Sequence, residues 1–193
     1  MFIDHSTTMR RPRGDGVRQA PSSIVTLHLD RCDQSCDEFL SLLFQRSLPN
    51  IRALTCGDAN ARLANGDFWP VQFPRLAPRL VRLHLEASVP DLIPHAPLLT
   101  GLETLEVSRE CDRAGWLPLL QALPDAQLRR LLLVGMVDPV TVANVVEALD
   151  CRSCRRLRAV SVCVADVLLW DEEEVRRVRD RCHRDGILFA TPE

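Results

Sequence analysis

A short aliphatic pattern recurs along this chain and restricts its fold more than any other feature. The pattern is Leu-x-x-Leu-x-Leu, with other aliphatic residues allowed, and its copies start at positions 24, 51, 80, 102, 128 and 157. These starts are separated by steps of 27, 29, 22, 26 and 29 residues. A degraded seventh copy lies at residues 187–190. Repeated copies at this spacing indicate a chain built from stacked structural units of roughly 20–29 residues.

The spacing within each copy favours a short strand. Side chains alternate along a strand, so the second and third aliphatic residues of a copy point to the same side. One strand cannot shield them alone, but a second copy stacked about 4.8 Å away closes the core and pairs the backbone. We therefore predict an α/β solenoid that is right-handed, with a curved parallel sheet on the concave side and helices and loops on the convex side.

The segments between the copies are expected to return the chain along the convex side. Residues 139–149 follow Asp138 and begin with proline, which is a helix start signal, and Val142, Val145, Val146 and Leu149 form the inward stripe. Residues 172–184 begin with acidic residues and end with arginines, with Val175, Val178 and Cys182 inward and Gly186 as the stop. Further helices are expected over residues 37–48 and 116–123. The proline-rich segment 60–78 is expected to be a loop with a short helical turn, and segment 89–100 is expected to be a single turn.

Composition and charge set the class of the protein. The 193 residues include 24 basic and 26 acidic ones, and this balance gives no support for binding to nucleic acid or to a membrane surface. Residues 1–22 read as a disordered leader without a secretory signal, and residues 23–193 as the repeat domain with a carboxyl-terminal capping helix and strand. We expect a cytoplasmic or nuclear location with reduced thiols. Every basic residue is arginine, so the chain offers no lysine side chain for ubiquitin attachment.

Polar and aliphatic side chains occupy the strand positions that face away from the expected core. Equivalent positions should form ladders across the sheet, with a charged cluster near its centre. Leu132 and Val134 are expected beside that cluster as an exposed apolar patch, the usual anatomy of a binding surface. The alternative is that these are solvated strand residues, or that a loop covers the apolar pair. The predicted partner-binding residues are His28, Asp30, Arg82, His84, Glu86, Glu106, Arg130, Leu132 and Val134.

Cysteine spacing offers a weak signal for a zinc site. Cys151-x-x-Cys154 has the spacing of half a zinc knuckle, which Cys182 and His183 could complete. However, the first two cysteines are expected in a loop and Cys182 on the buried face of the last helix. We therefore expect these cysteines to be small apolar residues or free thiols.

Other clusters also fail to suggest chemistry. His28 and His84 are expected two strands apart, about 10 Å, which is too far for one metal ion without a ligand between them. Glu172, Glu173 and Glu174 follow one another on a helix and therefore diverge. The sequence shows no phosphate-binding loop, nucleophile elbow or metalloprotease helix. We expect no enzymatic activity, no metal and no cofactor.

Three stretches carry a family resemblance: SIVTLHLDRC, PRLVRLHLEAS and GLETLEVSRE. They are similar to the repeat region of fungal F-box proteins, within the ribonuclease-inhibitor-like class of the leucine-rich-repeat superfamily. In that family an amino-terminal F-box docks onto a ubiquitin ligase and the repeats hold the substrate. No F-box-like segment precedes the repeats here, and the family's usual asparagine after the strand is absent.

The residues and the resemblance together predict a non-enzymatic protein–protein interaction module. The resemblance implies substrate recognition for an F-box-type ubiquitin ligase, with ligase components as candidate partners. Two alternatives remain open, a small-GTPase regulator of the leucine-rich-repeat type and a truncated fragment without a partner.

Overall fold

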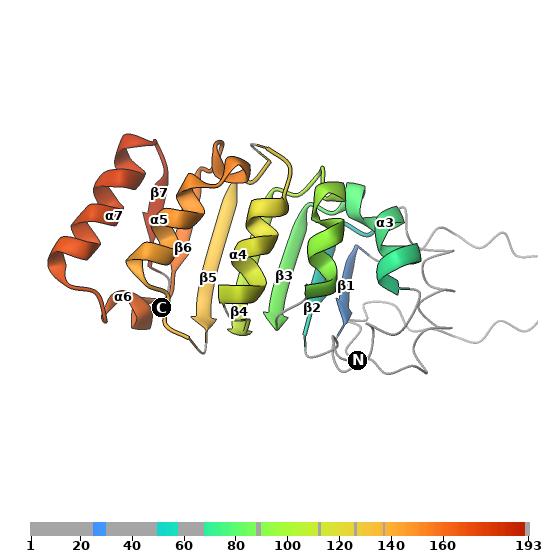
Figure 1. Ribbon diagram of the computed structural model, residues 1–193, viewed down its shortest axis with the longest axis horizontal. Helices are drawn as coiled ribbons and strands as arrows, with labels where there is room; N and C mark the ends of the chain where they lie inside the picture. Colours follow the sequence, from blue (N-terminus) through green and yellow to red (C-terminus); the bar gives the residue numbers. More distant parts are fainter. Residues whose placement is uncertain are drawn as a thin grey trace, which may run out of the picture.

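Seven parallel strands form a single sheet in the computed structural model of the chain (Figure 1). The structure describes residues 25–29, 50–57, 68–87, 90–111, 113–125, 127–136 and 138–191. The strands lie side by side in sequence order, and each is parallel to the next. They are β1 (Thr26–Leu29), β2 (Ala53–Cys56), β3 (Arg82–Ala87), β4 (Thr104–Glu110), β5 (Arg130–Met136), β6 (Ala159–Val162) and β7 (Leu188–Ala190).

The aliphatic residues of the repeated pattern lie in register across the sheet. Leu54 pairs with Leu27 and Leu83, and Leu105 pairs with Leu83 and Leu131. All five side chains are at most 3% exposed, because each one packs against its equivalents in the neighbouring strands. The predicted strands and their parallel stacking are confirmed. The degraded seventh copy forms β7, which pairs with β6.

The same backbone hydrogen bonds recur where the strands begin. The N–H groups of Val81 and Arg82 both donate to the carbonyl of Arg52, at 2.7 and 3.1 Å. Those of Glu103 and Thr104 both donate to the carbonyl of Val81, at 2.9 and 3.0 Å. Equivalent pairs of bonds join β1 to β2, β4 to β5 and β5 to β6. Five successive steps of the sheet therefore share one local geometry, as a chain of repeated units requires.

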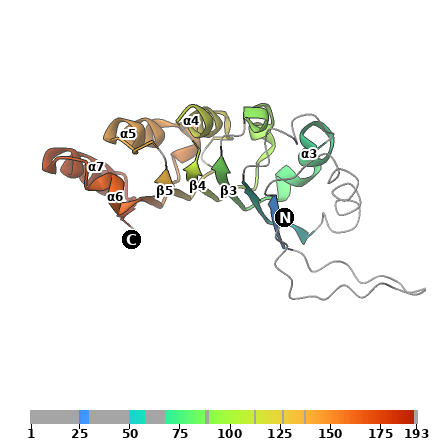
Figure 2. The same cartoon turned by 90° about the horizontal axis from the view of Figure 1, so that it is seen from below.

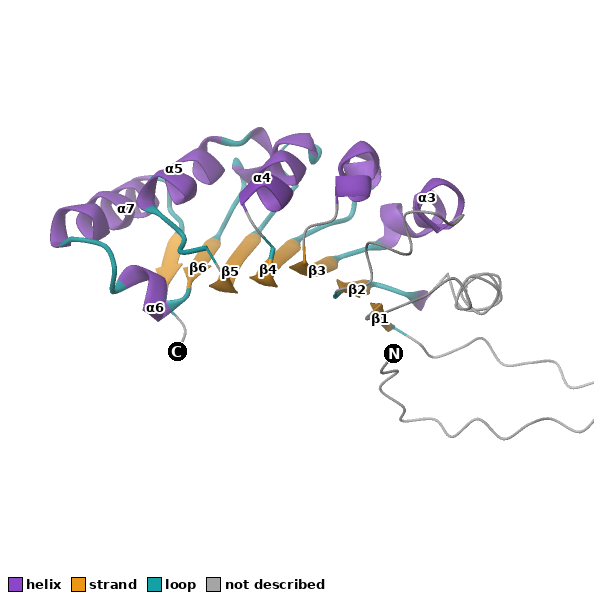
Figure 3. Ribbon diagram, turned by 60° about the horizontal axis from the view of Figure 1, so that its bottom comes forward, coloured by secondary structure: helices purple, strands orange, loops and turns teal. Residues whose placement is uncertain are grey.

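The helices form a second layer over one face of the sheet (Figure 2). The two layers follow a shallow arc, with the strands along its inner side and the helices along its outer side (Figure 3). Buried aliphatic residues of the strands and helices make one continuous core between the layers. The described helices are η2 (Phe68–Gln72), α3 (Phe73–Leu76), η3 (Ala77–Arg79), η4 (Pro90–Leu98), α4 (Arg113–Ala122), α5 (Val142–Asp150), η5 (Arg152–Cys154), α6 (Val164–Val167) and α7 (Glu172–Arg184).

Two proline-rich connectors contain more helix than the sequence predicts. Elements η2, α3 and η3 follow one another from residue 68 to residue 79, where we expected one short turn. Element η4 is a nine-residue 3₁₀ helix, where we expected a single turn. Proline fixes φ near the helical value, so the prolines of these segments are compatible with helical turns although they donate no backbone hydrogen bond. Buried residues such as Phe73 and Leu92 hold these segments against the core.

Helix α5 begins later than predicted. We expected Pro139 to start it after Asp138, but the first helical residue is Val142 and the cap is Thr141. The Thr141 hydroxyl accepts the N–H of Asn144 at 3.3 Å, and the Asn144 side chain accepts the N–H of Thr141 at 3.0 Å. This reciprocal pair satisfies two backbone donors, which a start at the proline does not offer.

The inward stripe of α5 follows the prediction. Val142, Val145 and Leu149 are buried, and Val146 is half-buried against the core. Helix α4 also forms, but it begins at Arg113 and not at residue 116. The expected helix over residues 37–48, the leader 1–22, Ile24 and Asp30 lie outside the described residues.

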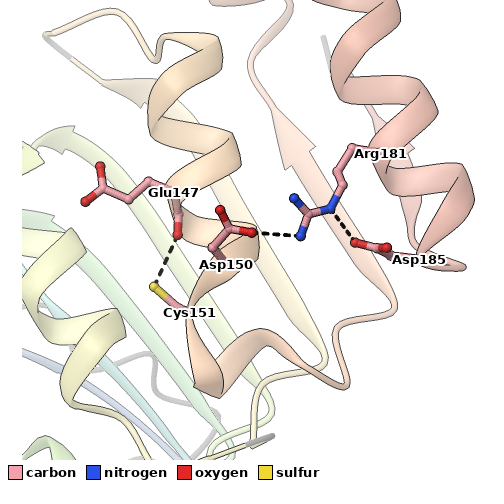
Figure 4. A network of polar contacts seen from close by, with 5 residues as sticks. All are labelled: Glu147, Asp150, Cys151, Arg181 and Asp185. Atoms are coloured by element: carbon pink, nitrogen blue, oxygen red, sulfur yellow. Dashed lines mark hydrogen bonds and ion pairs between the residues drawn. The ribbon is translucent and has the colours of Figure 1, made fainter.

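Helix α7 is stabilised by a capping box at its start and by an ion pair with α5. Asp171 accepts the N–H of Glu174 at 2.7 Å, and the Glu174 carboxylate accepts the N–H of Asp171 at 3.0 Å. Arg181 donates to Asp150 on α5 at 2.8 Å and to Asp185 at 2.7 Å (Figure 4). This arginine therefore holds the last helix beside α5.

The end of α7 leads directly into the last strand. Gly186 has φ +70°, which L-residues with a Cβ rarely adopt, and it ends the helix as predicted. Val178 and Cys182 are buried, as expected for the inward face of the helix, but Val175, also predicted there, is only half-buried because it lies in the first turn. Trp170 stacks against Phe189 of β7, with ring centroids 6.4 Å apart. These contacts cover the carboxyl-terminal end of the core, in line with the predicted cap.

Candidate interaction face of the sheet

One face of the sheet carries the helices, and the other carries none of those that the structure describes (Figure 2, Figure 3). We call the second face the open face. Because side chains alternate along a strand, it receives the residues between the buried aliphatic ones. Most of them are half-buried, and Thr26, Arg82, Arg130 and Leu188 are exposed. The open face comprises Thr26, His28, Ala53, Thr55, Arg82, His84, Glu86, Thr104, Glu106, Ser108, Arg130, Leu132, Val134, Ala159, Ser161, Leu188 and Ala190.

His84 is the centre of a polar cluster on the open face. Its Nε2 lies 2.7 Å from the Ser108 hydroxyl and 3.8 Å from Oε1 of Glu106. Glu106 is the direct partner of His84 on the neighbouring strand, and Ser108 is the diagonal neighbour two residues further along. The hydrogen bond fixes the orientation of the imidazole, and the carboxylate lies close enough to pair with it when it is charged.

This cluster does not have the geometry of a Ser-His-acid triad. In a triad, the serine and the acid contact different ring nitrogens, so that the acid orients the base. Here both Ser108 and Glu106 approach Nε2 of His84. Ser108 is also only 9% exposed. The arrangement suits recognition through a fixed set of donors and acceptors, and it lacks the relay that activates a nucleophile.

Two arginines flank the cluster where the strands begin. Arg82 and Arg130 are both exposed, and Thr104 is their common partner in the register. The two arginines are therefore two strand steps apart, about 10 Å. Glu86 is half-buried at the other end of β3 and has an interaction of its own.

Leu132 and Val134 lie beside the polar cluster, as predicted, but they are not exposed. Both side chains are half-buried. Leu132 has Glu106 on one side and Ser161 on the other, and Val134 pairs with Ser108. Neighbouring side chains on a strand ladder are close enough to shield one another, which explains the lower exposure. The pair forms a partly covered apolar spot next to charge.

The remaining predicted residues lie apart from this cluster. His28 is half-buried on β1, and Thr55 separates it from His84. The two histidines are thus two strand steps apart, as the sequence predicts. Asp30 lies outside the described residues, so its place on the open face stays a prediction. Over the described ranges, no group of three or more His, Cys, Asp or Glu residues is arranged to hold a metal ion.

The cysteines that suggested a zinc knuckle are buried. Cys151, Cys154 and Cys182 are 8%, 2% and 1% exposed, and all three are free thiols. Burial is the main cause that raises the pKa of Cys154 to about 12 and the pKa of Cys182 to about 11. Burial also raises the pKa of Cys151, and the carboxylates of Glu147 and Asp150 add to the shift. Protonated thiols of this kind pack as small apolar groups.

Ser108 is the member of the polar cluster that the prediction omits. It directly follows the fourth copy of the pattern, and only the diagonal offset between β3 and β4 brings it to His84. The one signal in the sequence is its position on the open face, two residues after Glu106. Nothing else in the sequence distinguishes this serine, because its partner His84 lies on the neighbouring strand.

Neither membrane insertion of a described helix nor a known family offers an explanation for the open face. In the segments that the structure describes, every helix is too short or too polar to cross a membrane. No protein family, curated protein or solved structure matches the chain. The residues of the sheet therefore carry the functional interpretation.

Proposed function

We propose that this chain is a non-enzymatic protein-interaction module that binds a protein partner with the open face of its sheet. The finer fold assignment, a right-handed solenoid of the leucine-rich-repeat type, belongs to the same proposal. One observation carries it: in-register strands place His84, Glu106 and Ser108 in one fixed polar cluster beside Leu132 and Val134. The proposal needs no metal and no cofactor.

The composition of the open face suits a protein partner. A binding surface usually has an apolar centre, a polar rim and a few arginine or aromatic anchors. Leu132 and Val134 supply the apolar centre, and the exposed Arg82 and Arg130 supply the anchors. Strands β3, β4 and β5 are each hydrogen-bonded to a strand on both sides, so little backbone conformational entropy is lost when a partner binds.

The resemblance to F-box repeat proteins suggests which process the module serves. We propose substrate recognition for an F-box-type ubiquitin ligase, acting in the cytoplasm or nucleus. The six described cysteines are free, which fits a reducing compartment. The absence of lysine fits a component that escapes side-chain ubiquitination. Co-purification of ligase components with the tagged chain from source cells tests this part, and their absence from all captured material contradicts it.

The test of the open face is a quantitative pull-down from an extract of the source cells. The variant Arg82→Glu/Leu132→Asp reverses one anchor and adds charge to the apolar centre. The control Arg177→Glu/Val71→Asp makes the corresponding Arg→Glu and aliphatic→Asp changes at exposed positions on the helix side. We expect the control to capture the wild-type partners and the open-face variant to lose them. Capture of the same partners by all three proteins contradicts the proposal.

A second candidate function, regulation of a small GTPase, is favoured by an acidic rim. Asp138, Asp171, Glu172 and Glu173 are exposed at the edge where the strands end and the helices begin. A pull-down with nucleotide-loaded GTPases tests this candidate. Binding that is lost in Glu172→Gln/Glu173→Gln supports it, and binding of no GTPase rules it out.

A further inference from the structure

Arginine side chains gather at the edge of the sheet where β5 and β6 begin. The N–H of Arg158 donates to the carbonyl of Arg129 at 2.8 Å, so these two residues start neighbouring strands. The turn between α5 and β6 lies at the same edge, which is the upper edge in Figure 1. We call this surface the arginine edge. It comprises Arg129, Arg130, Arg152, Arg155, Arg156 and Arg158.

The arginine edge is poorly neutralised. Arg129 lies 3.7 Å from Glu103, which is a weak, largely exposed pair. Asp150, the acid nearest in the chain to Arg152, is bound by Arg181. The other five arginines are exposed, and none of them bonds to a carboxylate in the part of the chain that the structure describes. Several like charges on adjacent positions repel one another, so an anion that bridges them is favoured.

The helix dipole of α5 explains part of the positive charge at the arginine edge, but not all of it. Each helix runs back along the sheet, so α5 ends at the arginine edge, where positive charge is favoured by the helix dipole. This accounts for Arg152, Arg155 and Arg156, which follow α5. It does not account for Arg129 and Arg158, which precede strands.

Four exposed acidic side chains lie at the opposite edge, whereas the acids at the arginine edge, Glu103, Asp125, Asp150 and Asp185, are fewer than its arginines. Asp138, Asp171, Glu172 and Glu173 are exposed where the strands end. The net charge of −2 is summed over the whole chain and does not show where the charges lie on the folded chain. The folded chain therefore offers one edge to a negatively charged partner.

We propose that the arginine edge binds a short acidic segment of the partner protein held by the open face. The proposal rests on the proposed function, and Arg130 belongs to both surfaces, which makes them continuous. Arginine binds carboxylates through two parallel hydrogen bonds, so closely spaced guanidinium groups match a run of Asp or Glu residues.

The size and composition of the edge favour a peptide over a nucleic acid. The patch is about two strands wide, which matches a few extended residues at about 3.3 Å each. A duplex offers many phosphates along its length, and single strands are usually held by aromatic stacking. The two segments that carry these arginines, 127–134 and 151–162, contain no aromatic residue.

A peptide-binding measurement on the full chain tests the proposal. The probe is a fluorescently labelled oligoglutamate peptide, with a serine–glycine peptide of the same length as the blank, and binding is followed by anisotropy at low salt. The variant Arg155→Gln/Arg158→Gln removes two charges from the edge and leaves the open face intact. The control Arg176→Gln/Arg179→Gln removes two exposed arginines from α7. We expect the edge variant to bind about fivefold more weakly, from two surface pairs, and the control to bind like wild type.

Four results would overturn the proposal. Equal weakening in both variants shows that only net charge matters. Tighter binding of a single-stranded oligonucleotide than of the peptide assigns the edge to nucleic acid. Salt-sensitive self-association that disappears in the edge variant assigns it to the acidic edge of a second copy. Capture of partners that depends on the open face but not on Arg155 and Arg158 refutes the arginine edge and leaves the proposed function standing.

Discussion

Buried cysteines should make this protein lose stability steeply in alkaline solution. Burial raises the pKa of Cys154 from 9.0 to about 12 and that of Cys182 from 9.0 to about 11. Below the ordinary pKa of 9.0, the thiols are neutral in both the folded and the unfolded chain, and their ionisation has no effect on stability. Above it, the unfolded chain releases these protons while the folded chain keeps them, so the unfolded state is favoured.

The size of the effect follows from the two pKa values. At about pH 11, the shift costs roughly 3 kcal/mol for Cys154 and roughly 2 kcal/mol for Cys182. Together these losses are comparable to the whole unfolding free energy of a typical domain. The chain contains no tyrosine and no lysine, and arginine stays charged, so cysteines are the only side chains that titrate in this range.

The assay is urea denaturation, followed by circular dichroism, between about pH 8 and pH 11 with a reducing agent present. We expect the unfolding free energy of the wild type to fall by about 2 kcal/mol per pH unit near pH 10. The variant Cys154→Ala/Cys182→Ala should be less stable at neutral pH but lose the larger part of this slope, and Cys151, whose pKa is also raised by burial, accounts for a remainder. The control Cys163→Ala, at a half-buried position, should keep it. An unchanged slope in the double variant shows that Cys154 and Cys182 do not cause the alkaline loss of stability.

Three further predictions concern the stacking of the repeats. Leu105→Ala should lower the free energy of unfolding, measured by urea denaturation, by about 3 kcal/mol, because the side chain is fully buried. Thr104→Ala on the open face should lower it by under about 1 kcal/mol, and equal losses contradict the assigned faces. Gly101→Ala should cost about 1–3 kcal/mol, because its Cβ would lie 2.9 Å from the carbonyl oxygen of Pro78, and an unchanged melting temperature contradicts this contact. Arg181→Gln should lower the free energy of unfolding by about 1 kcal/mol and speed amide hydrogen exchange in α7, and both effects should be smaller at high salt. Unchanged exchange shows that the ion pairs of Arg181 do not stabilise the helix.

The strands and the core were predictable because one local rule repeats. Each copy of the pattern buries aliphatic residues on one side of its strand. When copies with the same pattern stack, only one register buries the aliphatic residues of all of them together, and in this register Leu54, Leu83 and Leu105 are neighbours. The spacing of the copies alone places Arg82 and Glu106 on one face in that register. Helix α7 was equally clear, since acidic residues begin it and Gly186 ends it.

Two kinds of feature were not predictable from the sequence: helix ends for which two residues are possible starts, and contacts between residues that are far apart in the chain. Pro139 and Thr141 both offer a start for α5, and only the geometry of the Thr141 cap decides between them. The contact between His84 and Ser108 depends on a diagonal offset between two strands. The arginine edge joins residues before β5 to residues before β6, and a count of charges along the chain cannot show that they meet.

The parallel register between β4 and β5 decides which residues share the open face, and nuclear Overhauser effects between backbone protons test it most directly. The register pairs Thr104 with Arg130, Glu106 with Leu132 and Ser108 with Val134. We predict cross-peaks between the two strands that follow this order from start to end. Cross-peaks joining Thr104 to Val134, in antiparallel order, or a register displaced by one residue, would contradict the account.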